Sequence, residues 1–122
     1  YLLVGGYAVI YYGYARSTGD IDIWIRSSER NAKAVSRVLT TFGFSDSSFD
    51  PAIFMEQEKV FQIGIPPLRI DLLTGISGVE FDESFQNSAR INVDGTSIRI
   101  ISLADLRKNK AASGRAKDNA DL

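Results

Sequence analysis

Residues 19–25 constrain the fold more than any other segment of the chain. After Gly19, the isoleucines at positions 21, 23 and 25 alternate with Asp20, Asp22 and Trp24. Because successive side chains of an extended strand point to opposite faces, this alternation predicts a β-strand with one apolar face and one face that bears two carboxylates. The fold must therefore bury one side of this strand and give the acids a polar environment on the other.

The composition is that of one ordinary globular domain. The chain has 122 residues, of which 44% are hydrophobic and 24% are charged, and a chain of this size suits a single core. It has neither cysteine nor histidine, which excludes disulfides, thiolate nucleophiles, Cys/His zinc sites and serine-histidine-acid triads. Chemistry within this chain must use carboxylates, lysine, arginine, hydroxyls, backbone amides or a bound ion.

The charge balance indicates no general attraction towards nucleic acid or lipid. With 14 basic and 15 acidic residues the net charge is −1, so a polyanionic partner would need a local basic patch. Residues 1–15 are too few to span a membrane and lack the basic flank of a secretion signal. We expect a cytoplasmic protein with no membrane association, and a domain trimmed at both ends because it begins at Tyr1 and stops at Leu122.

The N-terminal half is predicted to alternate strands and helices. Glycines mark helix ends, and apolar residues recur at helical spacing after the alternating strand. The expected elements are a strand at 1–4, a helix from Gly5 to about Gly13, the strand at 19–25 and a helix from about 29 to 43. We expect residues 45–51 to form a loop, and periodicity leaves residues 52–58 open between a short helix and an irregular segment.

The C-terminal half is predicted to contain two hairpins and one helix. Pro66 and Pro67 mark the first hairpin's hinge, because neither can donate to a central ladder. Asp94 and Gly95 are a common turn pair for the second hairpin. The expected elements are strands at 59–65, 68–73, 89–93 and 97–101 and a helix from Ser102 to Gly114, with Ser102 as its cap.

Helices and strands alternate in this chain without a purely parallel pattern, and no internal repeat or linker divides it. We therefore expect an α+β fold, with one domain over residues 1–122 that consists of a mixed sheet and helices packed on it. Residues 45–57 and 75–87 are expected to be variable loops.

Three aspartates are the candidate centre of chemistry. Asp20 and Asp22 lie roughly 6 to 7 Å apart on one strand face, a spacing at which carboxylates can hold a hard cation such as Mg²⁺ or Mn²⁺. Asp71 interrupts an otherwise apolar strand, and it joins the pair if the two strands are neighbours about 4.8 Å apart. The alternatives are a solvent-facing acidic strand and a surface ion pair of Asp71 with Arg69 or Arg16.

Gly5 and Gly6 stand where a strand turns into a helix. Free backbone amides and the helix dipole can accept a phosphate at such a place, and glycine lets the phosphate approach. The alternative is a plain tight turn, which the two residues alone favour because the chain has no established phosphate-loop motif.

Lys110 is the candidate cation of the last helix. It follows Leu103 by seven residues and Leu106 by four, so it shares their inward stripe, whereas Arg107 and Lys108 are expected at the surface. An inward lysine suits an anionic ligand; the alternative is a lysine that extends its amine to solvent.

The order of these residues resembles a known family. The pair Gly5-Gly6 precedes Arg16-Ser-Thr18-Gly-Asp20-Ile-Asp22, and Leu68-Arg-Ile-Asp71-Leu-Leu follows much later. The pattern is similar to that of the polymerase-beta-like nucleotidyltransferase superfamily, and more narrowly to the minimal bacterial nucleotidyltransferases that include abortive-infection toxins. The likeness spans most of the chain, and Gly6 stands where many members of the superfamily have serine.

The resemblance implies a nucleotidyltransferase-like fold and the transfer of a nucleoside monophosphate from an NTP, such as ATP, to an acceptor hydroxyl with release of pyrophosphate. The residues implied to hold Mg²⁺ or Mn²⁺ are Asp20, Asp22 and Asp71. The residues implied to bind the nucleotide are Gly5, Gly6, Arg16 and Thr18. Lys110 is implied to reach a phosphate, with Arg115, Lys117 and Asp118 completing the motif.

Other functions stay open beside this one. A non-catalytic nucleotide-binding module, or a toxin-antitoxin component that pairs with a partner chain, would share the fold without turnover. A metal-dependent glycosyltransferase also uses two spaced aspartates, but residues 1–19 leave no room for its nucleotide-binding half. A phosphatase of the haloacid dehalogenase type expects Thr or Val where Trp24 stands. For a nucleotidyltransferase, the acceptor candidates are RNA, a protein hydroxyl and a small molecule such as an aminoglycoside.

Overall fold

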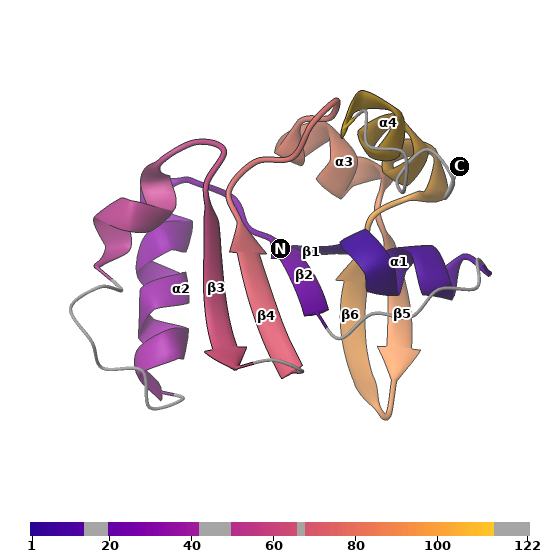
Figure 1. The fold of residues 1–122 in the computed structure, drawn as a ribbon. Coiled ribbons are helices and arrows are strands. Elements are labelled where there is room, and N and C mark those ends of the chain that lie inside the picture. Colours follow the sequence, from indigo (N-terminus) through magenta and orange to yellow (C-terminus); the bar gives the residue numbers. More distant parts are fainter. Residues whose placement is uncertain (14–19, 42–49, 66–67, 114–122) are drawn as a thin grey trace.

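The computed structural model describes residues 1–13, 20–41, 50–65 and 68–113 (Figure 1). In chain order the elements are β1 (Leu2–Val4), α1 (Gly5–Tyr11), β2 (Asp20–Trp24), α2 (Glu29–Thr41), the 3₁₀ helix η2 (Pro51–Met55), β3 (Val60–Ile65), β4 (Leu68–Leu73), α3 (Phe81–Asn87), β5 (Ala89–Val93), β6 (Thr96–Ile100) and α4 (Leu103–Ser113). Within these ranges no helix is both long enough and apolar enough to cross a membrane.

One mixed sheet organises the described part of the chain. Its six strands lie in the order β3-β4-β2-β1-β6-β5. Strand β1 runs antiparallel to β2 and parallel to β6, and β2 runs parallel to β4. The outer pairs, β3 with β4 and β5 with β6, are antiparallel. The predicted α+β class, the mixed sheet and both hairpins are confirmed.

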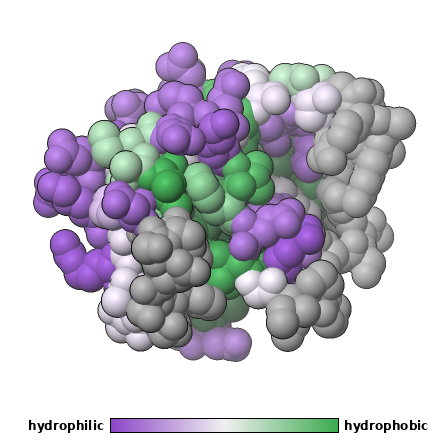
Figure 2. Space-filling model, turned by 60° about the vertical axis from the view of Figure 1, so that its left-hand side comes forward, coloured by the Kyte–Doolittle hydropathy of each residue, from purple (hydrophilic) through white to green (hydrophobic). Residues whose placement is uncertain are grey.

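The two faces of β2 pack against different groups of helices, as the alternation predicts. Ile23 and Ile25 belong to a hydrophobic cluster with Ala32 of α2 and Phe54 of η2. Trp24 belongs to the cluster on the other face, which includes residues of α1 and α4. Figure 1 shows α2 alongside β3 and α1 in front of β6. On the α2 side, brought forward in Figure 2, hydrophobic residues gather near the middle and hydrophilic residues surround them.

Local signals place the helix starts. In α2, the Ser28 hydroxyl accepts a hydrogen bond from the Asn31 backbone N–H at 3.3 Å. Before α4, the Ser102 hydroxyl accepts one from the Asp105 backbone N–H at 3.1 Å, which confirms the predicted cap. Each serine satisfies an amide that has no partner within its own helix.

The structure corrects the prediction of a loop at residues 75–87, because α3 occupies the second half of that segment. Phe81 and Phe85 stack at a centroid distance of 5.8 Å. The Arg26 guanidinium lies 5.0 Å from the Phe81 ring centroid, and Arg99 lies 4.4 Å from that of Phe85. Two aromatic rings therefore attach this short helix to cations on β6 and just after β2. Residues 52–58, for which periodicity left two structures open, begin in the 3₁₀ helix η2. The Ala52 backbone N–H of this helix donates a hydrogen bond to the Asp50 carboxylate.

The fold predicts a large stability loss for Ile100→Ala. Ile100 is fully buried in the cluster that joins β1, β2, α1 and α4, so the truncation leaves a cavity that its neighbours cannot fill. We expect the free energy of unfolding to fall by about 2 to 5 kcal/mol in a denaturant titration. The control Val93→Ala, at a half-exposed strand end, should change it by less than about 1 kcal/mol. Equal losses in the two variants would show that this cluster is not the main core.

Candidate functional site

The register between β2 and β4 brings the predicted acids together. Asp22 lies directly beside Asp71, and Asp20 lies beside Arg69. Neighbouring strands are about 4.8 Å apart, so matched positions on the same face bring their side chains into contact range. Asp71 is buried, with 8% of its surface exposed, whereas Asp20 is partly exposed. The predicted juxtaposition of the two strands is confirmed.

Arg69 lies between two of the three carboxylates. Its Nη2 donates a hydrogen bond to Asp20 Oδ2 at 2.8 Å, and its Nε is 3.3 Å from Asp71 Oδ1. The second contact is an ion pair without hydrogen-bond geometry, because neither Arg69 Nε nor Asp71 Oδ1 has a hydrogen-bond partner among the described residues. The guanidinium thus supplies the positive charge that partly offsets repulsion among these acids.

Asp22 is the acid whose proton affinity the site changes most clearly. The pKa of Asp22 is raised from its ordinary value of 3.8 to about 6, first by burial and then by the charge of Asp71 and a hydrogen bond to it. Asp20 adds a smaller repulsion, and Lys110 acts in the opposite direction by favouring the ionised form. Asp22 therefore interacts with two other carboxylates and one lysine within one site.

Gly5 lets the Asp22 side chain pack against the start of α1. A Cβ at Gly5 would lie 2.7 Å from Asp22 Cγ and 2.8 Å from Asp22 Cβ, and still closer to the carboxylate oxygen. Gly5 also has φ +67°, in the left-handed region that other residues rarely adopt. Glycine is therefore required here both by the backbone conformation and by the neighbouring carboxylate. Gly6 is buried within α1.

Lys110 enters the site from α4, as the helical spacing predicts. It is buried, with 6% of its surface exposed, while Arg107 and Lys108 on the same helix are exposed. Lys110 and Asp22 line one cavity of about 320 Å³, together with Gly5, Gly75 and Ser77. A cavity lined by a lysine, a carboxylate and the glycine-led start of a helix offers both a cation for an anionic ligand and oxygen donors for a metal.

The acids as arranged do not yet form a metal site. In the described ranges, no three side chains of the His, Cys, Asp and Glu types converge closely enough to hold a metal ion. The chemistry of the donors nevertheless fits Mg²⁺ or Mn²⁺, because all are carboxylate oxygens and one, Asp71 Oδ1, is buried without a hydrogen bond. A cation bound by all three would have to replace the Arg69 guanidinium.

Several predicted site residues lie outside the described residues: Arg16, Thr18, Arg115, Lys117 and Asp118. Sequence reasoning gave Arg69 only as the alternative partner of Asp71, and the structure pairs it with Asp20 as well. The sequence analysis did not predict helix α3. The four-residue spacing of Phe81 and Phe85, with the acids Asp82 and Glu83 in the first turn, was the available signal for that helix.

Comparisons with protein-family models, with curated proteins and with solved structures reveal no match to this chain. The geometry and charge of the site are therefore the observations from which a function can be inferred.

The raised pKa of Asp22 predicts pH-dependent stability. A carboxyl group that binds its proton more tightly when folded stabilises the fold below pH 3.8, and that contribution is lost as the pH rises towards 6. Asp22→Asn removes the ionisation. We expect the variant to have a higher free energy of unfolding than the wild type at about pH 8 and a similar one near pH 4, measured by urea titration. Parallel pH profiles for the two proteins would contradict this assignment.

Gly5→Ala is expected to destabilise the protein more than Gly95→Ala does. Both glycines have positive φ, +67° at Gly5 and +82° at Gly95, but a Cβ at Gly95 meets nothing within 4 Å. Gly95→Ala should therefore cost only backbone strain, about 1 to 2 kcal/mol, and Gly5→Ala should add the displacement of Asp22. Thermal and urea unfolding of both variants measure the difference, and equal costs would show that Asp22 does not pack on Gly5.

Proposed function

We propose that this chain is a metal-dependent nucleotidyltransferase that moves a nucleoside monophosphate from an NTP to an acceptor hydroxyl. The observation that carries the proposal is the matched register of Asp22 and Asp71, with Asp20 beside them on β2 and Lys110 across the cavity. Paired carboxylates on neighbouring strands supply negative charge for the metal ion, and the buried lysine beside them supplies positive charge for the triphosphate.

Asp20, Asp22 and Asp71 are the residues that would hold Mg²⁺ or Mn²⁺. The bound ion would supply neutralising charge for the triphosphate and a lower pKa for the acceptor hydroxyl. The charges of Asp71 and Asp20 contribute, after burial, to the raised pKa of Asp22, and Arg69 pairs with both of these acids. A divalent cation would relieve the negative charge that the three carboxylates share. The proposal requires that Arg69 releases Asp20 and Asp71, because these carboxylates need free oxygens to bind the ion.

The chain's own groups then have distinct roles in the transfer. The acceptor oxygen forms a bond to the α-phosphorus while the bond from that phosphorus to the bridging oxygen breaks, and pyrophosphate leaves with the electron pair. The hydroxyl proton passes to the Asp71 carboxylate. The Lys110 ammonium, which is buried and lines the same cavity as Asp22, offsets negative charge on the phosphates as the leaving group departs. The Gly5 and Gly6 amides and, outside the described residues, Arg16 and Thr18 complete the proposed nucleotide contacts.

A second candidate function is a nucleotide-binding module without turnover, such as a toxin-antitoxin component with a partner chain. The Arg69 pairs favour it, because an arginine that stays between Asp20 and Asp71 would exclude the metal. The two functions differ in one product. A transferase releases pyrophosphate from NTP in the presence of an acceptor, and a binding module does not.

The proposed transfer predicts that Asp71→Asn abolishes activity while the fold persists. Purified protein with Mg²⁺, α-labelled NTPs and cell extract should label an acceptor and release pyrophosphate. Asp71→Asn should lower the rate at least about 100-fold, because it removes both a metal oxygen and the proposed proton acceptor. The matched control Asp94→Asn changes an exposed turn residue with φ 49°, a conformation that asparagine tolerates. It should retain full activity.

Circular dichroism and thermal unfolding of Asp71→Asn separate lost chemistry from lost structure. Retained transfer in the folded variant would refute the proposed site. Tight NTP binding by the wild type without pyrophosphate release, across all four nucleotides and the extract, would favour the binding module.

A further inference from the structure

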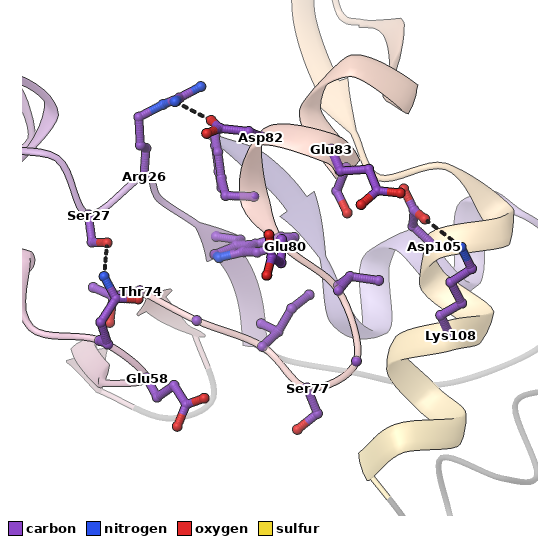
Figure 3. A pocket seen from close by; sticks show the side chains of 18 of the residues that line it. Arg26, Ser27, Glu58, Thr74, Ser77, Glu80, Asp82, Glu83, Asp105 and Lys108 are labelled. Atoms are coloured by element: carbon purple, nitrogen blue, oxygen red, sulfur yellow. Dashed lines mark hydrogen bonds and ion pairs between the residues drawn. The ribbon is translucent and has the colours of Figure 1, made fainter.

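A cavity of about 910 Å³ lies among the ends of β2 and β4, the segment 74–80, α3 and α4 (Figure 3). It is larger than the cavity that contains Asp22, and residues 75–77 form a wall that the two cavities share. Its lining has five carboxylates and two basic groups. Both basic groups are already paired with carboxylates, Arg26 with Asp82 and Lys108 with Asp105. An anionic partner is therefore repelled from this cavity and needs cations elsewhere on the chain.

The β5–β6 hairpin forms one edge of the sheet, and β5 is its outermost strand. Its two-residue turn, at 94–95, has φ values of +49° and +82°, as in a type I′ turn. The pair that flanks such a turn, here Val93 and Thr96, is hydrogen-bonded, and from there bonded and non-bonded pairs alternate along the hairpin. Every second residue of β5 therefore directs its backbone N–H and C=O away from β6, and these residues are Arg90 and Asn92.

The contacts of the hairpin agree with this alternation. The Arg99 N–H, on the strand opposite Arg90, turns away from β5 and donates to the Tyr1 hydroxyl at 3.2 Å. Arg90 and Asn92 are exposed, and outside the β5–β6 ladder neither forms a hydrogen bond with another described residue. The outer side of β5 is thus an open strand edge with free donors and acceptors.

The same edge carries two arginines side by side. Arg90 and Arg99 are cross-strand partners, and in a non-hydrogen-bonded pair the Cα atoms are only about 4.5 Å apart, so like charges there are destabilising. Arg99 lies 4.4 Å from the Phe85 ring centroid and donates to the Ser88 hydroxyl at 3.1 Å, but neither group is an anion. Arg90 forms no ion pair with a described residue. The one carboxylate of the hairpin, at Asp94, is about 13 Å further along the strand.

Protection of the edge against aggregation does not account for this pair. A charged side chain on an edge strand discourages unwanted pairing, which would explain Arg90 alone. Arg99 lies on β6, which has a strand on each side, so it protects no edge. Pairing with a second copy through β5 would bring two more arginines to the same place. The pair therefore favours a partner that carries the opposite charge.

We propose that β5 binds an extended segment of a partner protein in which acidic and apolar residues alternate. The segment adds a strand to the sheet, and its backbone hydrogen-bonds the outward N–H and C=O groups of Arg90 and Asn92. Its carboxylates lie on the face of these two residues, about 4.8 Å from β5. Its apolar side chains extend the opposite face beside Ile91 and Val93, of which Val93 is 46% exposed. This binding does not depend on the proposed transferase activity.

The test uses a labelled six-residue peptide of alternating glutamate and valine, blocked at both ends, and the full chain. We expect fluorescence anisotropy to show saturable binding that weakens as salt is added, and no binding of the matching lysine–valine peptide. Amide hydrogen exchange, followed by NMR, should slow at Arg90 and Asn92 when the glutamate–valine peptide is saturating. The Ile91 amide, which already faces β6, should change much less.

Three variants identify the groups that bind the peptide. Arg90→Gln should weaken binding about tenfold, because a charge-assisted contact is lost. Asn92→Pro removes an outward N–H without breaking the β5–β6 ladder, and it should weaken binding at least as much. The control Arg37→Gln removes the same charge from an exposed position on α2 and should bind like the wild type. Urea titration shows that each variant is folded.

Several results would overturn the proposal. One is the absence of saturable binding, and another is equal weakening by Arg90→Gln and Arg37→Gln. Binding that leaves amide exchange at Arg90 and Asn92 unchanged would place the peptide elsewhere. A short oligouridylate that binds more tightly than the peptide would assign the arginines to RNA. A concentration-dependent dimer that the peptide dissociates would assign the edge to a second copy. If Asn92→Pro does not fold, Arg90→Gln and the exchange data still decide.

Discussion

The parallel pairing of β2 with β4 is the constraint on which the rest of the site depends. It matches Asp22 with Asp71 between strands that are otherwise largely apolar. Two carboxylates in a half-buried position repel each other, and this repulsion adds to the effect of burial in raising the pKa of Asp22. The fold tolerates this arrangement because Arg69 and Lys110 bring positive charge to the same place. Hydrophobic packing on both faces of β2 supplies the opposing stability.

Much of this arrangement could be predicted from sequence because it depends on local periodicity. The alternation at 19–25 fixed which residues share a face, and the lone Asp71 within apolar residues identified the second strand. The inward position of Lys110 followed from its spacing to Leu106. Strand adjacency itself was a hypothesis, since no local signal specifies which strands pair.

The features that the sequence did not predict depend on contacts between distant segments. Helix α3 has seven residues and few buried side chains of its own, so its periodicity is weak. It is held by Arg26 and Arg99, which lie far from it along the chain. The pairing of Arg69 with Asp20 likewise needs the register of two strands before it can be inferred. The larger cavity is formed by the same distant segments, and its acidic lining was therefore hidden in a chain of nearly balanced charge.

The charges of the described residues divide between the two cavities in a way that bears on mechanism. The smaller cavity combines Asp22 with Lys110, and the larger one has an excess of carboxylates. Gly75 lies in the shared wall, and a Cβ there would lie 3.0 Å from Glu58 Cγ and 3.1 Å from Glu58 Cα and N. The wall is therefore closely packed against one of the acids that face the larger cavity. The uneven charge of the two linings therefore favours an anionic ligand in the smaller cavity over the larger one.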